Sequence, residues 1–193
     1  MPEVTSEPQE KPTTAGPEVA KDRQVLDFAL WLTPRGAERY AWRERIEAVA
    51  KLLGGPVFAP HVTLFGTFRR SVPEALVLAE ALSRDLAPIP ISGAGLGIGA
   101  DPWQALYVPL VVNPQLWRAR RRVCEVLDAE GAADFMPHLS LYYGDAPTVQ
   151  KCQAVELLEP LPVIDWCAQE LVLVTLGDRP ERWSTEAILP FRG

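Results

Sequence analysis

The chain has 193 residues, of which 48% are hydrophobic, and this length and composition suit one globular domain or two small lobes that share a core. It carries 19 basic and 25 acidic residues, for a net charge of -6. This balance argues against long nucleic acid as a partner, because phosphate binding needs clustered Lys and Arg. No apolar run in the sequence approaches the length of a membrane span, so no membrane partner is expected.

The start of the chain differs in composition from the rest. Residues 1–22 are rich in Pro, Glu and Thr and lack aromatic residues, so they cannot bury enough apolar surface to offset chain entropy. We predict a disordered tail there and a single domain over residues 23–193. The cysteines Cys124, Cys152 and Cys167 form no CxxC pair and no signal-peptide pattern precedes them, which predicts a reduced, cytoplasmic protein with structural thiols.

Hydrophobic periodicity divides the predicted domain into strands and helices. In the first strand Leu26, Phe28, Leu30 and Leu32 alternate with other residues and should share one buried face. Strands are predicted, in chain order, over residues 24–33, 61–68, 88–99, 105–112, 138–143, 161–176 and 183–189. Helices are predicted over residues 36–53, 73–86, 114–129 and 148–158.

The order of these elements favours one fold class. Strands come as adjacent pairs over residues 88–112 and 161–189, which indicates an α+β fold with antiparallel sheets rather than a doubly wound parallel sheet. Each half of the chain contains one histidine strand, a helix near it and a hairpin. Two similar lobes facing each other would bring the strands of His61 and His138 together at the centre.

Two helices carry patterns that the structure can test. The apolar stripe of the helix over residues 36–53 is predicted to consist of Tyr40, Ile46, Val49 and Leu53. The densest basic run, residues 118–122, has helical spacing beside Val123 and is predicted to be a solvated helix face. A small anionic ligand held in one pocket stays open as an alternative.

The glycine-rich stretch GAGLGIGA over residues 93–100 invites comparison with a phosphate-binding loop. It lacks the Gly-Lys-Ser/Thr ending, and Asp101-Pro102 breaks the chain before another strand, so no helix follows to complete such a site. We therefore predict a bent strand and turn in which side chains must be small.

The surroundings of the two histidines repeat. FAPHVTLFG surrounds His61 and FMPHLSLYYG surrounds His138, so each histidine follows Pro and precedes an apolar, a hydroxyl and another apolar residue. A lone histidine among apolar residues is usually structural, but coincidence is a poor account of two such matching motifs. Residues two apart on a strand point the same way, so His61 should share a face with Thr63, and His138 with Ser140.

This set of side chains suits phosphodiester hydrolysis without a metal. Zinc needs three or four ligands and each motif supplies one, so no metal and no other cofactor is expected. One imidazole can accept a proton from attacking water while the other donates a proton to the leaving oxygen. The hydroxyls of Thr63 and Ser140 can hold the phosphoryl oxygens on which charge develops.

The doubled motifs PHVTL and PHLSL resemble those of the two-histidine phosphoesterase superfamily, which is defined by two His-x-Ser/Thr motifs on paired lobes. Within it the chain is most similar to the plant and yeast type cyclic phosphodiesterases, which open ADP-ribose 1'',2''-cyclic phosphate and nucleoside 2',3'-cyclic phosphates. The similarity covers about residues 24–193 and includes FALWLTP, WQALYVPL and LVLVTLGDRPERWSTEAIL. It implies a LigT-like α+β fold, in which two pseudo-symmetric lobes face a central cleft with helices outside.

The resemblance also implies roles for single residues. His61 and His138 become the acid and base pair, and Thr63 and Ser140 become the phosphate holders. A family tyrosine five places after the second histidine corresponds to Tyr143, although strict strand alternation would favour Tyr142. Trp31 matches a family tryptophan that could stack on a base or sugar, and its alternative is a core aromatic.

The implied substrate is a small cyclic phosphate nucleotide, acted on by a monomer without a metal. Two alternatives stay open: a nucleotide-binding module of the same fold without turnover, and an RNA 2',3'-cyclic phosphodiesterase or ligase-like enzyme. The first need not keep both motifs complete, as they are here. An RNA-directed enzyme would need a more basic cleft than the net acidic composition of this chain predicts.

Overall fold

The computed structural model describes residues 24–131, 133–160 and 162–193, and the tail predicted over residues 1–22 lies outside the described residues. Along the described chain the elements follow in this order: β1 (Val25–Leu32), α2 (Gly36–Leu53), β2 (Val62–Ser71), α3 (Val72–Asp85), β3 (Ile89–Ala94), β4 (Gly97–Ile98), the 3-10 helix η1 (Pro102–Gln104), β5 (Leu106–Pro109), α4 (Pro114–Leu127), β6 (His138–Tyr142), α5 (Thr148–Leu157), β7 (Val163–Ala168), β8 (Glu170–Thr175), the 3-10 helix η2 (Pro180–Arg182) and β9 (Ser184–Pro190).

The strands of the two histidine motifs are neighbours in the middle of the main sheet. Its seven strands run in the order β4-β5-β6-β2-β1-β8-β9, while β3 and β7 form a separate antiparallel pair. β2 and β6 meet through one residue pair, Val62 with Leu139, so the sheet divides there into two lobes. His61 directly precedes β2, and His138 is the first residue of β6. The predicted meeting of the two histidine strands is confirmed.

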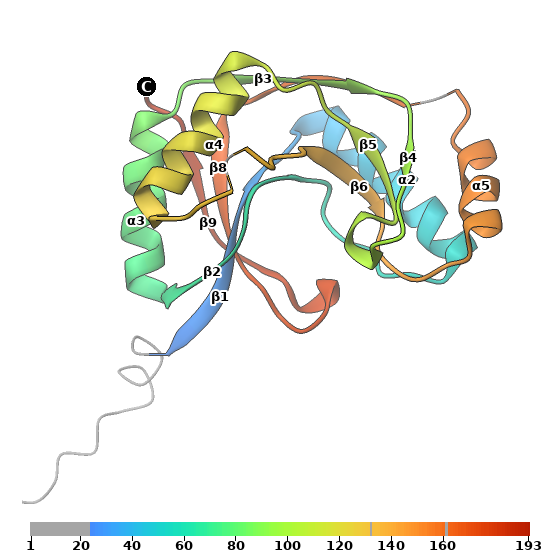
Figure 1. Ribbon diagram of the computed structural model, residues 1–193, viewed down its shortest axis with the longest axis horizontal. Helices are drawn as coiled ribbons and strands as arrows, with labels where there is room; N and C mark the ends of the chain where they lie inside the picture. The colour runs from blue at the N-terminus through green and yellow to red at the C-terminus, as the bar shows by residue number, and fades with distance from the viewer. Residues whose placement is uncertain (1–23, 132, 161) are drawn as a thin grey trace, which may run out of the picture.

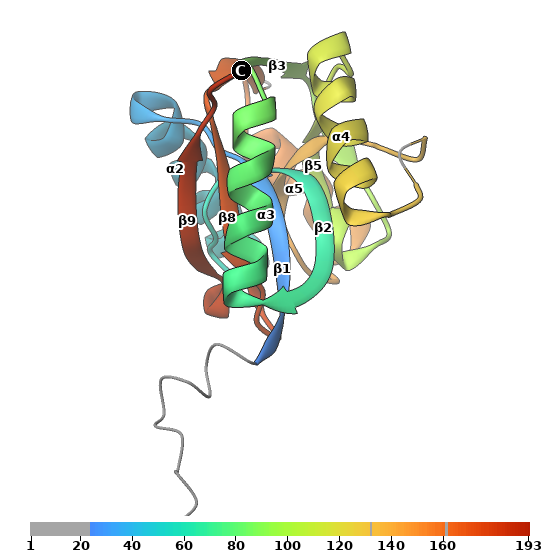
Figure 2. The same ribbon diagram turned by 90° about the vertical axis from the view of Figure 1, so that its left-hand side faces the viewer.

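The helices cover the two lobes from outside, but the lobes are not the two halves of the sequence. α3 and α4 lie beside the half of the sheet that contains β1, β2, β8 and β9, while α2 and α5 lie beside the half that contains β6 (Figure 1). The view in Figure 2 shows α3 across the face of β8, β1 and β2. The C-terminal strands therefore return to the first lobe. The predicted α+β class with antiparallel sheets and outer helices is confirmed.

The two faces of β1 have different neighbours. Phe28, Leu30 and Leu32 are fully buried in the main hydrophobic core, as the alternation predicts. Ala29 and Trp31 point to the opposite face and belong to a second, smaller apolar cluster. The face of β1 opposite the main core therefore carries Trp31, the side chain that stacks on His61.

The apolar stripe of α2 differs from the prediction. Tyr40, a predicted member, is 72% exposed. The buried residues of this helix are Trp42, Ile46, Val49 and Ala50. Their spacing of four, three and one residues follows the helical period, and Tyr40 lies out of phase with it.

Two predicted strands are each divided in the structure. Residues 161–176 contain β7, which pairs with β3, and β8, which pairs with β1 and β9. The chain changes sheet at Gln169, between these two strands. Residues 88–99 contain β3 and β4, separated by a turn in which Gly95 has a φ of +79°. This left-handed backbone conformation is easily adopted only by glycine, and it ends the strand.

The glycine-rich stretch is a strand and turn in which Gly93, Gly97 and Gly99 have no room for a side chain. A Cβ atom on Gly97 would collide with the ring of Tyr107, and one on Gly99 would collide with the carbonyl oxygen of Gln104. No α-helix follows this stretch, because the short η1 and then β5 come next. The predicted bent strand and turn is therefore confirmed.

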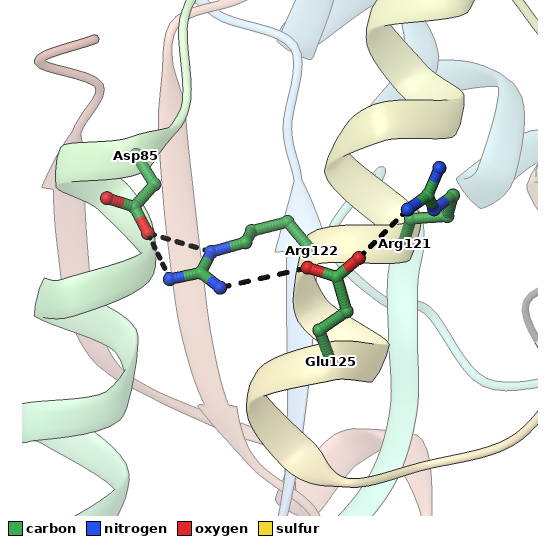
Figure 3. Close-up of polar contacts among 4 residues, drawn as sticks. All are labelled: Asp85, Arg121, Arg122 and Glu125. Atoms are coloured by element: carbon green, nitrogen blue, oxygen red, sulfur yellow. Dashed lines mark hydrogen bonds and ion pairs between the residues drawn. The ribbon is translucent and has the colours of Figure 1, made fainter.

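The basic run on α4 contains an ion-pair link to the neighbouring helix. The guanidinium of Arg122 lies 2.7 Å from a carboxylate oxygen of Asp85 on α3 and 3.8 Å from one of Glu125 (Figure 3). Arg121 pairs with the same Glu125 at 3.1 Å. These side chains are about half exposed, in keeping with the predicted solvated helix face.

Arg120 departs from that prediction, because it points inward. Its Nη1 donates to the carbonyl oxygen of Leu64 on β2 at 2.9 Å, and its Nη2 donates to that of Gly131 at 3.3 Å. The guanidinium also lies over the rings of Phe65 and Phe135, at 4.7 and 5.2 Å from their centroids. Arg120 thus connects α4 both to the strand that follows His61 and to the segment that leads to His138.

Two further features of the described residues concern membranes and cysteines. Within these ranges, no helix has both the length and the apolar content to cross a membrane. The thiols of Cys124, Cys152 and Cys167 are all free, with the first buried and the other two exposed. None of the three thiols lies in the cavity between the histidines.

Candidate active site

Each histidine is anchored by the same type of backbone contact. Nδ1 of His61 lies 2.7 Å from the carbonyl oxygen of Ala59, and Nδ1 of His138 lies 3.0 Å from that of Met136. A carbonyl oxygen can only accept, so both Nδ1 atoms donate, and Nε2 carries the lone pair of each neutral imidazole. The two side chains therefore present the same nitrogen for proton transfer.

Each proline of the repeated motif lies in sequence between a histidine and the residue whose carbonyl oxygen that histidine contacts. Pro60 separates His61 from its carbonyl partner, and Pro137 separates His138 from its own. A proline fixes its φ near about -65° and keeps the preceding residue extended, so the turn has few alternatives. The repeated proline is thereby explained as a device that orients each imidazole through the backbone.

His61 is enclosed by aromatic side chains. Its ring stacks on Trp31, with centroids 3.7 Å apart and planes inclined by 11°. The hydroxyl of Tyr143 lies 3.4 Å from Nε2 of His61, and Phe58 meets the imidazole edge to face at 6.1 Å. The imidazole is consequently held on both ring nitrogens and on one face.

Burial changes the proton affinities of this group of side chains. It lowers the pKa of His61 from 6.5 to about 4; the contact with Ala59 opposes this shift, and the charge of His138 adds to it. The pKa of His138 is also lowered, mainly by burial and against the contact with Met136. Burial raises the pKa of Tyr143 to about 12, so its phenol keeps the proton that it can donate to His61.

A cavity of about 220 Å³ lies between the two histidines. One histidine comes from each lobe, so the cavity spans the junction of β2 and β6. Its lining residues are Ala29, Trp31, His61, Thr63, Gly66, Asp101, Trp103, Gln104, His138, Tyr143, Leu176 and Trp183. Two imidazoles and a hydroxyl thus face one small space, as paired proton transfer to a bound phosphate requires.

Most of the side chains singled out in the sequence meet at this cavity. The predicted residues that line it are His61, His138, Thr63, Tyr143 and Trp31. Ser140 does not line it: this side chain is buried, and its hydroxyl bonds to that of Tyr143, which lowers the pKa of Tyr143 against the larger effect of burial. Ser140 therefore touches the phenol that in turn contacts His61.

Two aromatic side chains needed the structure to be placed. Tyr143 faces the cavity and Tyr142 does not line it, because β6 ends at Tyr142 and strand alternation stops there. Trp31 is only 5% exposed, and one face of its ring stacks on His61. The structure thus places Trp31 as a support for the imidazole, between the two interpretations that the sequence left open.

Among the cavity side chains that sequence reasoning missed are two tryptophans and a glutamine. Trp103 and Gln104 belong to η1, and Trp183 directly follows η2. Short 3-10 turns have no hydrophobic period, so periodicity could not find them. The resemblance to the family could have located them, because the similar stretches WQALYVPL and LVLVTLGDRPERWSTEAIL contain all three residues.

The arrangement of possible metal ligands bears on the expected absence of a cofactor. In the part of the chain that the structure describes, no group of three or more His, Cys, Asp or Glu side chains is arranged to hold a metal ion. The expectation of a metal-independent reaction stays a prediction.

A bilobal α+β fold that places one histidine of each lobe at a shared cavity defines a two-histidine phosphoesterase. The sequence profile of the 2'-5' RNA ligase superfamily matches residues 30–180. The chain belongs to this superfamily, as the resemblance of its motifs indicates.

Individual relatives agree with this assignment. A cyclic phosphodiesterase of Arabidopsis thaliana is 24% identical over 129 residues, which are 67% of this chain and 71% of the relative. Escherichia coli LigT complexed with 3'-AMP has a TM-score of 0.60 at 16% identity, over 88% of this chain and 100% of that chain. A protein of Thermus thermophilus has a TM-score of 0.58 at 21% identity, over 87% and 99% of the two chains. The predicted LigT-like fold is confirmed.

Proposed function

We propose that the protein is a metal-independent cyclic phosphodiesterase that hydrolyses nucleoside 2',3'-cyclic phosphates, ADP-ribose 1'',2''-cyclic phosphate or both. The observation that carries this proposal is the pair of imidazoles, His61 and His138, which face one small cavity with Nδ1 bound to the backbone. The activity named for the Arabidopsis thaliana relative and the 3'-AMP bound to Escherichia coli LigT support a small nucleotide as substrate.

His61 is the proposed base and His138 the proposed acid. Burial favours the neutral form of His61 more strongly than that of His138. In the free protein the phenol of Tyr143 can donate to Nε2 of His61, and in the proposed reaction it turns to the bound phosphate and leaves this lone pair to water. Nε2 of His61 takes a proton from water as the water oxygen attacks phosphorus. Nε2 of His138 gives a proton to the ribose oxygen whose bond to phosphorus breaks. The product is an acyclic monophosphate, and proton exchange with solvent restores both imidazoles.

Hydroxyl groups are proposed to hold the phosphoryl oxygens. Thr63 lines the cavity directly, beside His61 on the same strand. The hydroxyl of Ser140, which does not line the cavity, is proposed to donate to the phenol oxygen of Tyr143, so that the phenol is the hydroxyl that the second lobe offers to a bound phosphoryl oxygen. Such fixed donors stabilise the charge that develops on phosphoryl oxygens, because they need no reorganisation during the reaction.

The test is product identification with cyclic substrates in the presence of EDTA. We expect adenosine 2',3'-cyclic phosphate or ADP-ribose 1'',2''-cyclic phosphate to give an acyclic monophosphate. Phosphorus NMR identifies this product and measures the rate at which it forms. His61→Ala and His138→Ala should each slow this reaction by about 10²- to 10⁴-fold, since each removes one proton-transfer partner. These variants also control for a contaminating phosphodiesterase.

Two outcomes would contradict the proposal. Activity that EDTA abolishes and zinc restores would indicate metal catalysis instead. Binding of the cyclic nucleotide without any ring opening would indicate a binding module of the same fold.

A further inference from the structure

The strands next to the two histidine strands share one further feature, an aromatic residue at the same register. On β1, which neighbours β2, Trp31 lies opposite Thr63. On β5, which neighbours β6, Tyr107 lies opposite Ser140. Because each hydroxyl residue follows its histidine by two places, each aromatic residue is a diagonal cross-strand neighbour of a histidine and lies within reach of its ring.

Both aromatic side chains reach the imidazole on the neighbouring strand. The ring of Trp31 stacks on that of His61, with centroids 3.7 Å apart. The ring of Tyr107 lies 5.2 Å from that of His138, at an inclination of 58°. Tilted aromatic pairs make favourable contacts at centroid separations of about 4.5 to 7 Å. Tyr107 is therefore related to the second histidine as Trp31 is to the first.

A glycine makes room for the ring of Tyr107. Gly97 on β4 pairs with Tyr107, and a Cβ atom on Gly97 would lie 2.8 Å from the phenol oxygen and closer still to two carbons of the ring. Any side chain at this position would therefore displace the ring. The left-handed turn of this glycine-rich stretch is made by Gly95. The structure thus gives Gly97 a different reason to be glycine, which is the close approach of Tyr107.

A contact with the ring matters to His138 because its backbone anchor leaves part of its orientation free. The bond from Nδ1 to the carbonyl oxygen of Met136 holds one atom of the imidazole. The direction of Nε2, which gives the proton in the proposed reaction, also depends on how the ring plane is turned about that bond. A misplacement of about 1 Å at a reacting group can slow a reaction about 100-fold. The ring of Tyr107 limits this rotation.

We propose that Tyr107 is the positioning residue of His138, and that Gly97 provides the space in which Tyr107 does this. The inference rests on the proposed function, in which His138 is the acid. Tyr107 does not line the cavity between the histidines, so it acts on a substrate only through the imidazole. In the other lobe Trp31 has the corresponding role toward His61, the proposed base.

Two leaving groups separate this role from a merely structural one. In adenosine 2',3'-cyclic phosphate the oxygen that leaves phosphorus belongs to ribose and needs a proton, whereas a p-nitrophenyl phosphodiester releases a phenolate that needs none. We expect Tyr107→Ala to lower kcat on the cyclic nucleotide about 100-fold, because the acid is misplaced. KM should change little, since the lining of the cavity is retained. The p-nitrophenyl ester should lose little of its rate.

Three further variants act as controls. Tyr107→Phe keeps the ring and should behave as the wild-type protein. Gly97→Ala keeps the tyrosine but occupies the space of its ring, so it should reproduce the loss that Tyr107→Ala causes. Trp31→Ala should slow both substrates, because both need the base that it releases. Equal effects of Tyr107→Ala on the two substrates, or a phenylalanine variant as impaired as the alanine variant, would overturn the proposal.

The orientation of the imidazole can also be measured without a substrate. The chain has two histidines, so nitrogen-15 NMR of the imidazoles contains only their signals. At a pH above 6.5, where both rings are neutral, His138 should carry its proton on Nδ1, as the bond to Met136 requires. In Tyr107→Ala we expect its signals to move toward the tautomer mixture of a free imidazole, while those of His61 stay unchanged.

This measurement keeps the positioning role separate from the proposed function. A wild-type protein that opens no cyclic phosphate would refute the proposed function, and the NMR comparison would still decide the role of Tyr107. Gly97→Ala replaces Tyr107→Ala in both measurements if the latter variant does not fold. A proton of His138 that stays on Nδ1 in these variants as it does in the wild-type protein would show that Tyr107 does not position the ring.

Discussion

At the scale of single residues, the two imidazoles share an anchor but differ in their surroundings. Both donate from Nδ1 to the carbonyl oxygen two residues earlier. His61 is buried among Trp31, Phe58 and Tyr143, whereas His138 is half-buried and has the ring of Tyr107 at 5.2 Å. Chemically identical groups can therefore take opposite roles, because burial separates their proton affinities.

This difference predicts where activity depends on pH. In the proposed mechanism, the productive form of the free protein has neutral His61 and protonated His138. Below the pKa of His61, about 4, the base becomes protonated, and above the pKa of His138, which lies below 6.5, the acid loses its proton. We therefore expect a plot of kcat/KM against pH to be bell-shaped with its maximum on the acid side of 6.5.

Single variants assign the two limbs of that curve. With a p-nitrophenyl phosphodiester, whose leaving group needs no proton, His138→Ala should recover much of its lost rate and lose the alkaline limb. His61→Ala should stay impaired on the same ester, because no group then activates water. A flat profile for the wild-type protein, or equal rescue of the two variants, would refute this division of roles.

At the scale of elements, Arg120 is the side chain that ties α4 to both histidine segments. Replacement by alanine removes donors to the carbonyl oxygens of Leu64 and Gly131 and a cation above two phenylalanine rings. We expect Arg120→Ala to lower the free energy of unfolding by about 2 kcal/mol, measured by urea denaturation. The carbonyl of the exposed Gly131 can bond to water instead, which limits the loss, whereas that of the buried Leu64 loses a donor.

Two neighbours on the same helix are matched controls. Arg118 is exposed, so Arg118→Ala should change the free energy of unfolding by less than about 0.5 kcal/mol. Arg122→Ala breaks a half-exposed ion pair with Asp85 and should cost about 1 kcal/mol or less. Equal losses for all three variants would show that the inward contacts of Arg120 add nothing.

At the scale of the whole molecule, the sequence predicted what repetition and local period encode. The doubled motif, read with strand alternation, located His61, Thr63 and His138 at a common site. The class of fold followed from the order of elements. Whether Tyr40 or Trp103 is exposed depends instead on which parts of a distant chain segment cover them, and no local pattern carries that information.

The division of residues 161–176 between two sheets was hidden for the same reason. β7 and β8 are each strand-like in sequence, but their partners, β3 and β1, are distant along the chain. The place of Ser140 also depended on tertiary structure. Alternation puts this residue on the face of His138, and only the packed phenol of Tyr143 explains why it does not line the cavity.

Charge around the cavities predicts a ranking of substrates. The carboxylates of Asp27, Asp101 and Asp178 line the cavity or the hollows beside it. Asp27 pairs with Arg69 at 3.5 Å, and Asp178 pairs with Arg182 at 3.2 Å and with Arg179 at 4.0 Å. The whole chain adds a net charge of -6. Substrates with few negative charges should therefore be captured fastest, since like charges slow association.

A nucleoside 2',3'-cyclic phosphate carries one negative charge, and the pyrophosphate of ADP-ribose 1'',2''-cyclic phosphate adds two more. We expect kcat/KM to be about tenfold higher for the nucleoside substrate at low ionic strength, and added salt should narrow this gap by screening the repulsion. Asp178→Asn should reduce the difference in kcat/KM between the two substrates even without added salt, whereas Glu156→Gln on the distant helix α5 should not. A kcat/KM for the ADP-ribose compound that falls as salt is added would reveal attraction instead, and would show that cations outside these cavities guide the substrate.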